Sequence, residues 1–179
     1  AIVTGAGSGI GRALAYQLAA EGATVIINDF NAETLNETYL NIVQRGGNVS
    51  QHPFDVSKRE AMFDFADTVI QQHGKADIVI NNAGVALGKI TVSDVSYEEL
   101  EWIFGVNLWG VIHGTKAFLP HLLKQPESAL VNLSSVFGIA GIAKQAPYCT
   151  TKFAVRGFTE SLRMELQRSY PNITITSVH

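Results

Sequence analysis

Three features that define large classes of protein are scarce or missing in this sequence of 179 residues. The single cysteine, Cys149, cannot form a disulfide within the chain, so nothing indicates a secreted, disulfide-stapled fold. The 13 Lys and Arg residues are outnumbered by 16 Asp and Glu and form no basic stripe, so nucleic-acid binding is not indicated. No apolar run reaches the roughly 18 residues of a membrane span, and no signal peptide is recognisable. We therefore expect a cytoplasmic protein with a small-molecule partner.

Short apolar segments alternate with longer segments of helical periodicity along the whole chain. This alternation is typical of βαβ units, and Val- and Ile-rich strands without polar alternation indicate a parallel sheet covered by helices on both faces. We predict one three-layer, doubly wound α/β domain over residues 1–179, with strand order 3-2-1-4-5-6. Both ends coincide with expected strands, so we expect the domain to be truncated at both ends. The expected strands are Ala1–Thr4, Thr24–Asn28, Asn48–His52, Asp77–Asn81, Ala129–Leu133 and Thr174–Val178.

Residues that commonly begin or end helices occur in each of the three segments between the first four expected strands. Gly22 follows an amphipathic segment as its expected C-terminal glycine, and Asn31 is the expected N-cap of a second helix. Ser57 and Glu60 have the spacing of a capping box, which predicts a third helix that ends before Gly74.

Two later helices are expected at Tyr97–Lys124, with a break near Gly105, and at Ala146–Tyr170. Both are apolar around much of their circumference, unlike a helix with one side in water. Two interpretations remain open: deep burial within one subunit, or contact with a second copy in a homodimer or homotetramer. The residues concerned are Val111, Ile112, Phe118, Leu119, Leu122 and Leu123 on the first helix and Phe153, Val155, Phe158, Leu162 and Met164 on the second.

A glycine-rich segment, Thr4–Gly11, joins the first expected strand to the first helix. Glycines permit a tight turn and let backbone N–H groups approach a pyrophosphate, whose charge the helix N-terminus favours. A purely structural turn is disfavoured, because so many glycines at a helix start lower stability unless a ligand needs the space. The segment predicts a Rossmann-type dinucleotide site. The expected contacts are Gly5, Ser8, Gly9, Ile10 and Gly11.

Asp29 stands at the end of the second expected strand, where a carboxylate accepts hydrogen bonds from the adenosine ribose and repels a 2′-phosphate. Ser8 adds no positive charge to the turn, so NAD is favoured over NADP as cofactor. Arg12 on the first helix is a possible phosphate partner, but we interpret it as a solvated surface charge.

Tyr148 and Lys152 are four residues apart at the start of the last expected helix, directly after Pro147, so they lie on one helix face. A cation close to a tyrosine favours its phenolate, which suits proton exchange near neutral pH. Such a pair alone is more often a helix-surface pair. The dinucleotide site is what favours the catalytic interpretation.

Motifs in a fixed order give the chain a strong resemblance to the short-chain dehydrogenase/reductase family. They are Thr4-Gly5-x-x-x-Gly9-x-Gly11, Asp55-Val56, Asn81-Asn82-Ala83-Gly84, Asn107, Ser135 and Tyr148-x-x-x-Lys152. The resemblance spans nearly the whole chain. It also implies that a further C-terminal strand and a substrate lid are missing after the sixth strand.

The resemblance implies a catalytic set of Asn107, Ser135, Tyr148 and Lys152. Tyr148 would exchange the proton and Ser135 would hydrogen-bond the substrate oxygen. Lys152 would assist Tyr148 and hold the nicotinamide ribose, while Asn107 would hold a water that connects Lys152 to solvent. Ser134 is an alternative to Ser135, and the family's spacing to the tyrosine selects Ser135.

The same resemblance assigns the remaining cofactor contacts. Asp55 and Val56 would meet the adenine, and Asn82, Ala83 and Gly84 would line the cofactor beside the fourth strand. Each of these residues taken alone could instead serve to form a turn or cap a helix. Such structural roles are a much less satisfactory explanation for the whole set.

These motifs together predict an NAD-dependent oxidoreductase that transfers hydride between NAD(H) and the carbon of a secondary alcohol or ketone, without a metal ion. The apolar stretch Phe137–Ala143, together with Val85–Leu87, indicates a fairly hydrophobic substrate, although core packing explains both equally well. A non-catalytic nucleotide-binding regulatory or scaffold protein of the same fold is the alternative, which the intact catalytic set disfavours.

Overall fold

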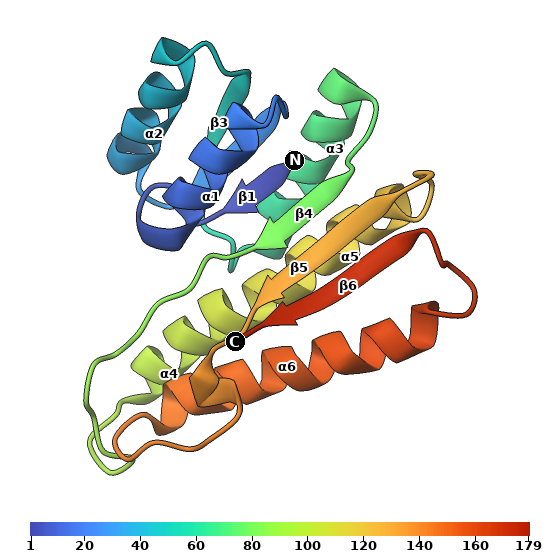
Figure 1. Cartoon of the computed structure of the whole chain (residues 1–179). Helices are drawn as coiled ribbons and strands as arrows, with labels where there is room; N and C mark the ends of the chain where they lie inside the picture. The colour runs from blue at the N-terminus through green and yellow to red at the C-terminus, as the bar shows by residue number, and fades with distance from the viewer.

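A parallel sheet of six strands runs through the computed structural model, which describes all of residues 1–179 (Figure 1). The strands are β1 (Ile2–Thr4), β2 (Val25–Asp29), β3 (Val49–Pro53), β4 (Ile78–Asn81), β5 (Ser128–Leu133) and β6 (Ile173–Val178). Their order is β3-β2-β1-β4-β5-β6, and every neighbouring pair is parallel. The predicted fold class and strand order are confirmed, and each strand boundary lies within one residue of its expected position.

Helices cover the sheet in two layers, each around its own apolar cluster. On one face, α1 (Gly9–Ala20) and α2 (Ala32–Gln44) pack on alternate strand residues such as Val3 and Ile27. On the other face, α3 (Arg59–His73), α5 (Gly110–Leu122) and α6 (Ala146–Leu166) enclose Phe118 and Leu130. The layers leave the carboxyl ends of the strands to connecting loops, which is where parallel α/β sheets bind ligands.

The helix boundaries follow the expected residues at three of four sites, and the first is Gly22, which directly follows the C-cap Glu21 of α1 with φ +86°. Asn31 caps α2, since its side chain accepts hydrogen bonds from the N–H groups of Glu33 and Thr34. Gly74 ends α3 in the left-handed conformation, at φ +75°. The capping box predicted at Ser57 is wrong: Asp55 accepts the Ser57 N–H at 2.9 Å, so the chain makes a further turn and α3 begins only after Lys58.

The first of the two later helices is interrupted, as expected, near Gly105. Its first part, α4 (Tyr97–Phe104), passes into a π-helical segment at Gly105–Trp109 before α5 continues to Leu122. The π-helical segment carries Asn107, which is fully buried. π-Helical turns add one residue to the helical repeat and so shift which side chains share a face.

Most of the apolar residues singled out on these helices face the core of one subunit. Five of the eleven are buried and two, Leu119 and Leu123, are half-buried against the same core, whereas Phe153 and Met164 are exposed at 43% and 69%. The buried residues are Val111, Phe118, Leu122, Val155 and Leu162. Deep burial therefore accounts for the larger part of the pattern. No helix of the chain combines the length and apolar character needed to cross a membrane.

Candidate functional site

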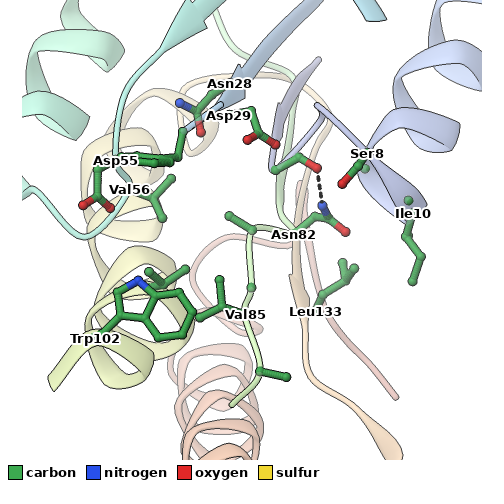
Figure 2. A pocket seen from close by; sticks show the side chains of 18 of the residues that line it. Ser8, Ile10, Asn28, Asp29, Asp55, Val56, Asn82, Val85, Trp102 and Leu133 are labelled. Carbon is green, nitrogen blue, oxygen red and sulfur yellow. Dashed lines mark hydrogen bonds between the residues drawn. The ribbon is translucent and has the colours of Figure 1, made fainter. Parts of the chain in front are cut away.

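A cavity of about 880 Å³ lies at the carboxyl ends of β1, β2 and β4 (Figure 2). Its volume falls in the range of small-molecule and cofactor sites. All thirteen residues expected to contact a cofactor line it, although they come from widely separated parts of the chain. They are Gly5, Ser8, Gly9, Ile10, Gly11, Asp29, Asp55, Val56, Asn82, Ala83, Gly84, Tyr148 and Lys152.

The glycine-rich turn forms one wall of the cavity and is braced by the turn after β4. Asn82 Nδ2 donates to the Thr4 and Gly5 carbonyls at 2.8 and 3.1 Å, and Thr4 Oγ1 accepts the Asn82 N–H at 3.0 Å (Figure 2). A side chain at Gly11 would have its Cβ 2.8 Å from the Gly5 carbonyl carbon, so only glycine fits there. The Ser8 side chain caps no N–H of α1, which leaves the first helical N–H groups available to an anion.

Arg12 does not behave as the solvated charge expected from the sequence. Its guanidinium donates to the Gly7 carbonyl, to the Thr34 carbonyl at 3.0 Å and to the Glu37 carboxylate at 2.9 Å. The side chain is only 28% exposed. Arg12 thus joins the glycine-rich turn to α2, and the earlier interpretation is wrong because its partners lie on another helix.

Asp29 is held in a fixed orientation at the end of β2. One carboxylate oxygen accepts the Gly7 N–H and the other accepts the Asn31 N–H, both at 2.9 Å. An ionised carboxylate has about four acceptor positions, so two remain for hydroxyl groups of a ligand in the cavity. The orientation is fixed by backbone donors before any ligand binds.

Tyr148 and Lys152 project from the first turns of α6 into the same cavity. The Lys152 Nζ lies 5.6 Å from the centre of the Tyr148 ring and donates to the Leu133 carbonyl at 2.9 Å. Burial of the ammonium group lowers the pKa of Lys152 from 10.5 to about 8. The lysine is therefore a desolvated cation directly beside the tyrosine.

Asn107 connects the π-helical segment to the loop after β4. Its Oδ1 accepts the Val85 N–H at 2.7 Å, and its Nδ2 donates to the Val85 carbonyl at 2.9 Å. A Cβ at Gly84 would lie 3.4 Å from Lys152 Nζ and 3.5 Å from Asn107 Oδ1. The amide and the ammonium group thus border one small space, which the absence of a side chain at Gly84 keeps open.

The two neighbouring serines differ in what their hydroxyl groups already bind. Ser134 is buried and donates to the Lys152 carbonyl at 2.9 Å, so its proton is engaged although the residue lines the cavity. Ser135 is not among the lining residues, but its Oγ only accepts, from the Phe137 N–H at 3.1 Å. Its own O–H is therefore available to a substrate, which favours Ser135 as expected.

Nine further residues line the cavity beyond the cofactor contacts expected from the sequence. Seven of them lie at the carboxyl end of a strand or in the loop that follows it, so the rule that ligands bind at the carboxyl ends of strands indicates them. Trp102 and Val106 belong to α4 and the π-helical segment, and no sequence signal marks them. Nowhere do three or more His, Cys, Asp or Glu side chains gather as a metal site. The nine are Asn28, Phe30, Phe54, Val85, Ala86, Trp102, Val106, Leu133 and Ser134.

Comparison with known sequences finds relatives over the entire chain. The model of the short chain dehydrogenase family matches residues 1–179. SadH, an inferred oxidoreductase of Mycobacterium tuberculosis, is 41% identical over 180 residues that cover 100% of this chain. The chain spans 64% of the length of SadH.

Comparison with solved structures gives the same fold. A short chain dehydrogenase/reductase from Burkholderia phymatum, solved in complex with NAD, has a TM-score of 0.94 at 32% identity, covering 98% of this chain and 63% of that one. A metagenomic short-chain oxidoreductase solved with NADP has a TM-score of 0.93 at 31% identity, covering 99% and 79%. A nicotinamide dinucleotide is therefore supported as the kind of cofactor, and both forms occur among similar structures.

Proposed function

The chain belongs to the short-chain dehydrogenase family, and on this premise we propose that it transfers hydride between NAD(H) and the carbon of a secondary alcohol or ketone. One observation carries the proposal: Tyr148, with the Lys152 ammonium group beside it, faces the same cavity as the glycine-rich turn and Asp29. A nucleotide site and a proton-exchanging site thus share one space. A protein that only bound nucleotides would not need the second.

The cofactor is held by parts of the chain that are already in place. The N–H groups at the start of α1 favour the pyrophosphate, and Asp29 accepts the adenosine ribose hydroxyls with its two remaining acceptor positions. Asp55, Val56 and the Asn82–Gly84 turn line the remainder. NAD, when bound, supplies or accepts the hydride.

The proton is exchanged by Tyr148. In the reductive direction its hydroxyl gives a proton to the substrate oxygen, and in the oxidative direction the phenolate accepts one. Burial lowers the pKa of Lys152 to about 8, which still leaves most of the lysine protonated at neutral pH. The cation stabilises the phenolate, and the O–H of Ser135 donates to the substrate oxygen as charge develops. Asn107 holds the water through which Lys152 is connected to solvent.

NAD is the proposed form of the cofactor rather than NADP. Asp29 carries negative charge where a 2′-phosphate would lie, and like charges repel. Arg12 is the nearest candidate to neutralise a phosphate, but its guanidinium is engaged by Gly7, Thr34 and Glu37. The ion pair with Glu37 makes Arg12 a less favourable partner for a phosphate than a free cation would be.

The proposed substrate is a fairly hydrophobic small molecule. Between Ser135 and Tyr148, the chain exposes three aliphatic side chains: Val136 at 60%, Ile139 at 54% and Ile142 at 44%. Core packing would have buried them. Their exposure on the segment that joins Ser135 to Tyr148 supports an apolar wall for the substrate.

The function is tested by following NADH formation against a panel of secondary alcohols, with Tyr148→Phe as the matched variant. The unmodified chain is expected to turn over at least one hydrophobic alcohol, and Tyr148→Phe to lose turnover while binding NAD almost normally, because it removes the proton donor but little cofactor contact. A variant as active as the unmodified protein would refute the role of Tyr148. Tight NAD binding with no turnover of any alcohol would favour a nucleotide-binding regulatory protein.

We also infer that copies of the chain associate as a homodimer or homotetramer. Phe153 and Met164 project from the outer side of α6 at 43% and 69% exposure, and large apolar side chains on one helix are typical of subunit contacts. Light scattering at micromolar concentration is expected to show a multiple of the monomer mass. A monomer would contradict the inference.

A further inference from the structure

Two large aromatic side chains line the cavity and remain open to solvent. Phe30 is 80% exposed and Trp102 is 49% exposed. Phe30 directly follows Asp29, so it lies at the ribose end of the cavity. Trp102 comes from a different layer, on α4, and belongs to none of the motifs that identify the nucleotide site. An exposed indole on a ligand cavity has an apolar surface that a bound ligand would remove from water.

The helix that carries Trp102 continues into segments that pack against the loop after β3, and Trp102 and Val56 line the same cavity. A Cβ at Gly105, one turn after Trp102, would lie 3.3 Å from Ser57 Cβ, and a Cβ at Gly110 would lie 2.8 Å from Val56 Cγ2. Val106, four residues after Trp102, lines the same cavity. This helix face therefore borders the loop after β3. Figure 2 draws Trp102, Val56 and Val85 among the residues that line this cavity.

We propose that Trp102 forms a wall of the adenine site, so that its indole contacts the adenine ring of the bound dinucleotide. The inference rests on the proposed function, in which Asp55 and Val56 meet the adenine. The opposite end of the dinucleotide belongs to Tyr148 and Lys152 on α6. Adenine is a flat π system, and an indole gives it a contact that depends on ring stacking rather than on hydrogen bonds.

The test uses the fact that the chain has only two tryptophans, Trp102 and Trp109. Trp109→Phe leaves Trp102 as the single emitter, and Trp102→Phe leaves Trp109, which is exposed to a similar degree at 52% but stacks on His113. Each variant is titrated with AMP, which carries the adenine, and with nicotinamide mononucleotide, which does not. AMP does not absorb tryptophan emission, so quenching reports contact rather than energy transfer.

AMP is expected to quench the emission of Trp109→Phe and to leave that of Trp102→Phe unchanged, and nicotinamide mononucleotide is expected to quench neither. Trp102→Ala is expected to bind AMP and NAD about tenfold more weakly, within the range for losing one base–aromatic contact. Its affinity for nicotinamide mononucleotide should not change.

Each contrary result has one meaning. The role of Trp102 would be overturned if Trp102→Ala bound AMP with unchanged affinity, or if AMP quenched both single-tryptophan variants equally. In either case, NAD binding measured by calorimetry would leave the proposed function intact. If Trp102→Ala bound AMP and nicotinamide mononucleotide more weakly by the same factor, the role of Trp102 would also be overturned, because equal losses indicate a general loss of structure. Absence of NAD binding to the unmodified chain would refute the proposed function itself.

Discussion

Replacing Lys152 by methionine is expected to make the folded protein more stable while it abolishes turnover. The lysine is 3% exposed, and its pKa falls from 10.5 to about 8 because the ammonium group is buried. At about 1.4 kcal/mol per pKa unit, this fall corresponds to a cost of about 3 kcal/mol for keeping the lysine charged in the folded state. Methionine has a similar length and no charge to desolvate.

One favourable contact of Lys152 is lost in the variant. The ammonium group donates to the Leu133 carbonyl at 2.9 Å, and losing a hydrogen bond of this kind costs about 1 kcal/mol when water from the cavity can replace the donor. The desolvation cost is larger than this loss. Lys152→Met is therefore expected to raise the free energy of unfolding by about 2 kcal/mol at neutral pH.

The pH dependence separates this cause from better packing of methionine. Because folding lowers the pKa of Lys152, the folded chain loses the lysine proton near pH 8, whereas the unfolded chain keeps it until about pH 10.5. Below about pH 8 the folded protein bears the full desolvation cost of the charged lysine. Between about pH 8 and pH 10.5 this cost is progressively lost, so the stability of the unmodified protein rises relative to that of Lys152→Met. Urea unfolding without cofactor should show the advantage of Lys152→Met near pH 7 and its disappearance near pH 10. An advantage independent of pH, or a variant less stable at pH 7, would refute the reasoning.

Two substitutions test the preference for NAD. The unmodified protein is expected to bind NAD on the order of a hundredfold more tightly than NADP, and Asp29→Ala should reduce this ratio, mainly by weakening NAD binding. Adding Ser8→Arg to Asp29→Ala should shift the preference toward NADP, because the arginine supplies a partner for the phosphate. Fluorescence titration with both cofactors measures these affinities. Arg12→Met is expected to weaken both cofactors by a similar factor, because the guanidinium braces the turn at Gly7 and is held by Glu37. A selective loss of NADP in Arg12→Met would instead place Arg12 on the phosphate.

The fold could be predicted from the sequence because its strands are marked locally. Most strands are short runs of apolar or β-branched residues between polar or glycine-containing turns, whereas the edge strand β3 contains only one aliphatic residue, Val49. All six positions could be predicted to within one residue. The start of α3 was misplaced because a side chain outside the helix decides it. Asp55 takes the N–H of Ser57, and no pattern of spacing shows that this contact outcompetes a capping box.

Site residues could be predicted from the sequence where their chemical type and spacing indicate their role. Those that reach the site only through packing of distant segments could not. Tyr148, Lys152 and the glycines are recognisable by type and spacing. Arg12 was misread because its partners Thr34 and Glu37 are 22 and 25 residues away along the chain. Trp102 was missed because it belongs to no motif, and only the packing of α4 and its continuation brings this residue to the cavity.

The cofactor end of the cavity is fixed by the fold, whereas the substrate end is left to a loop. On the cofactor side, Thr38 Oγ1 donates to the Ala6 carbonyl at 2.9 Å from α2, and Asn82 binds the opposite side of the same turn from β4. The turn is thus held from two elements that the core itself positions. On the substrate side, Ile139 and Ile142 are exposed on a segment between β5 and α6 that makes few side-chain hydrogen bonds. Residues in such a segment can change without disturbing the sheet, because their side chains contribute little to the core. Motifs therefore identify the cofactor and the reaction, while the identity of the alcohol depends on the side chains of this loop.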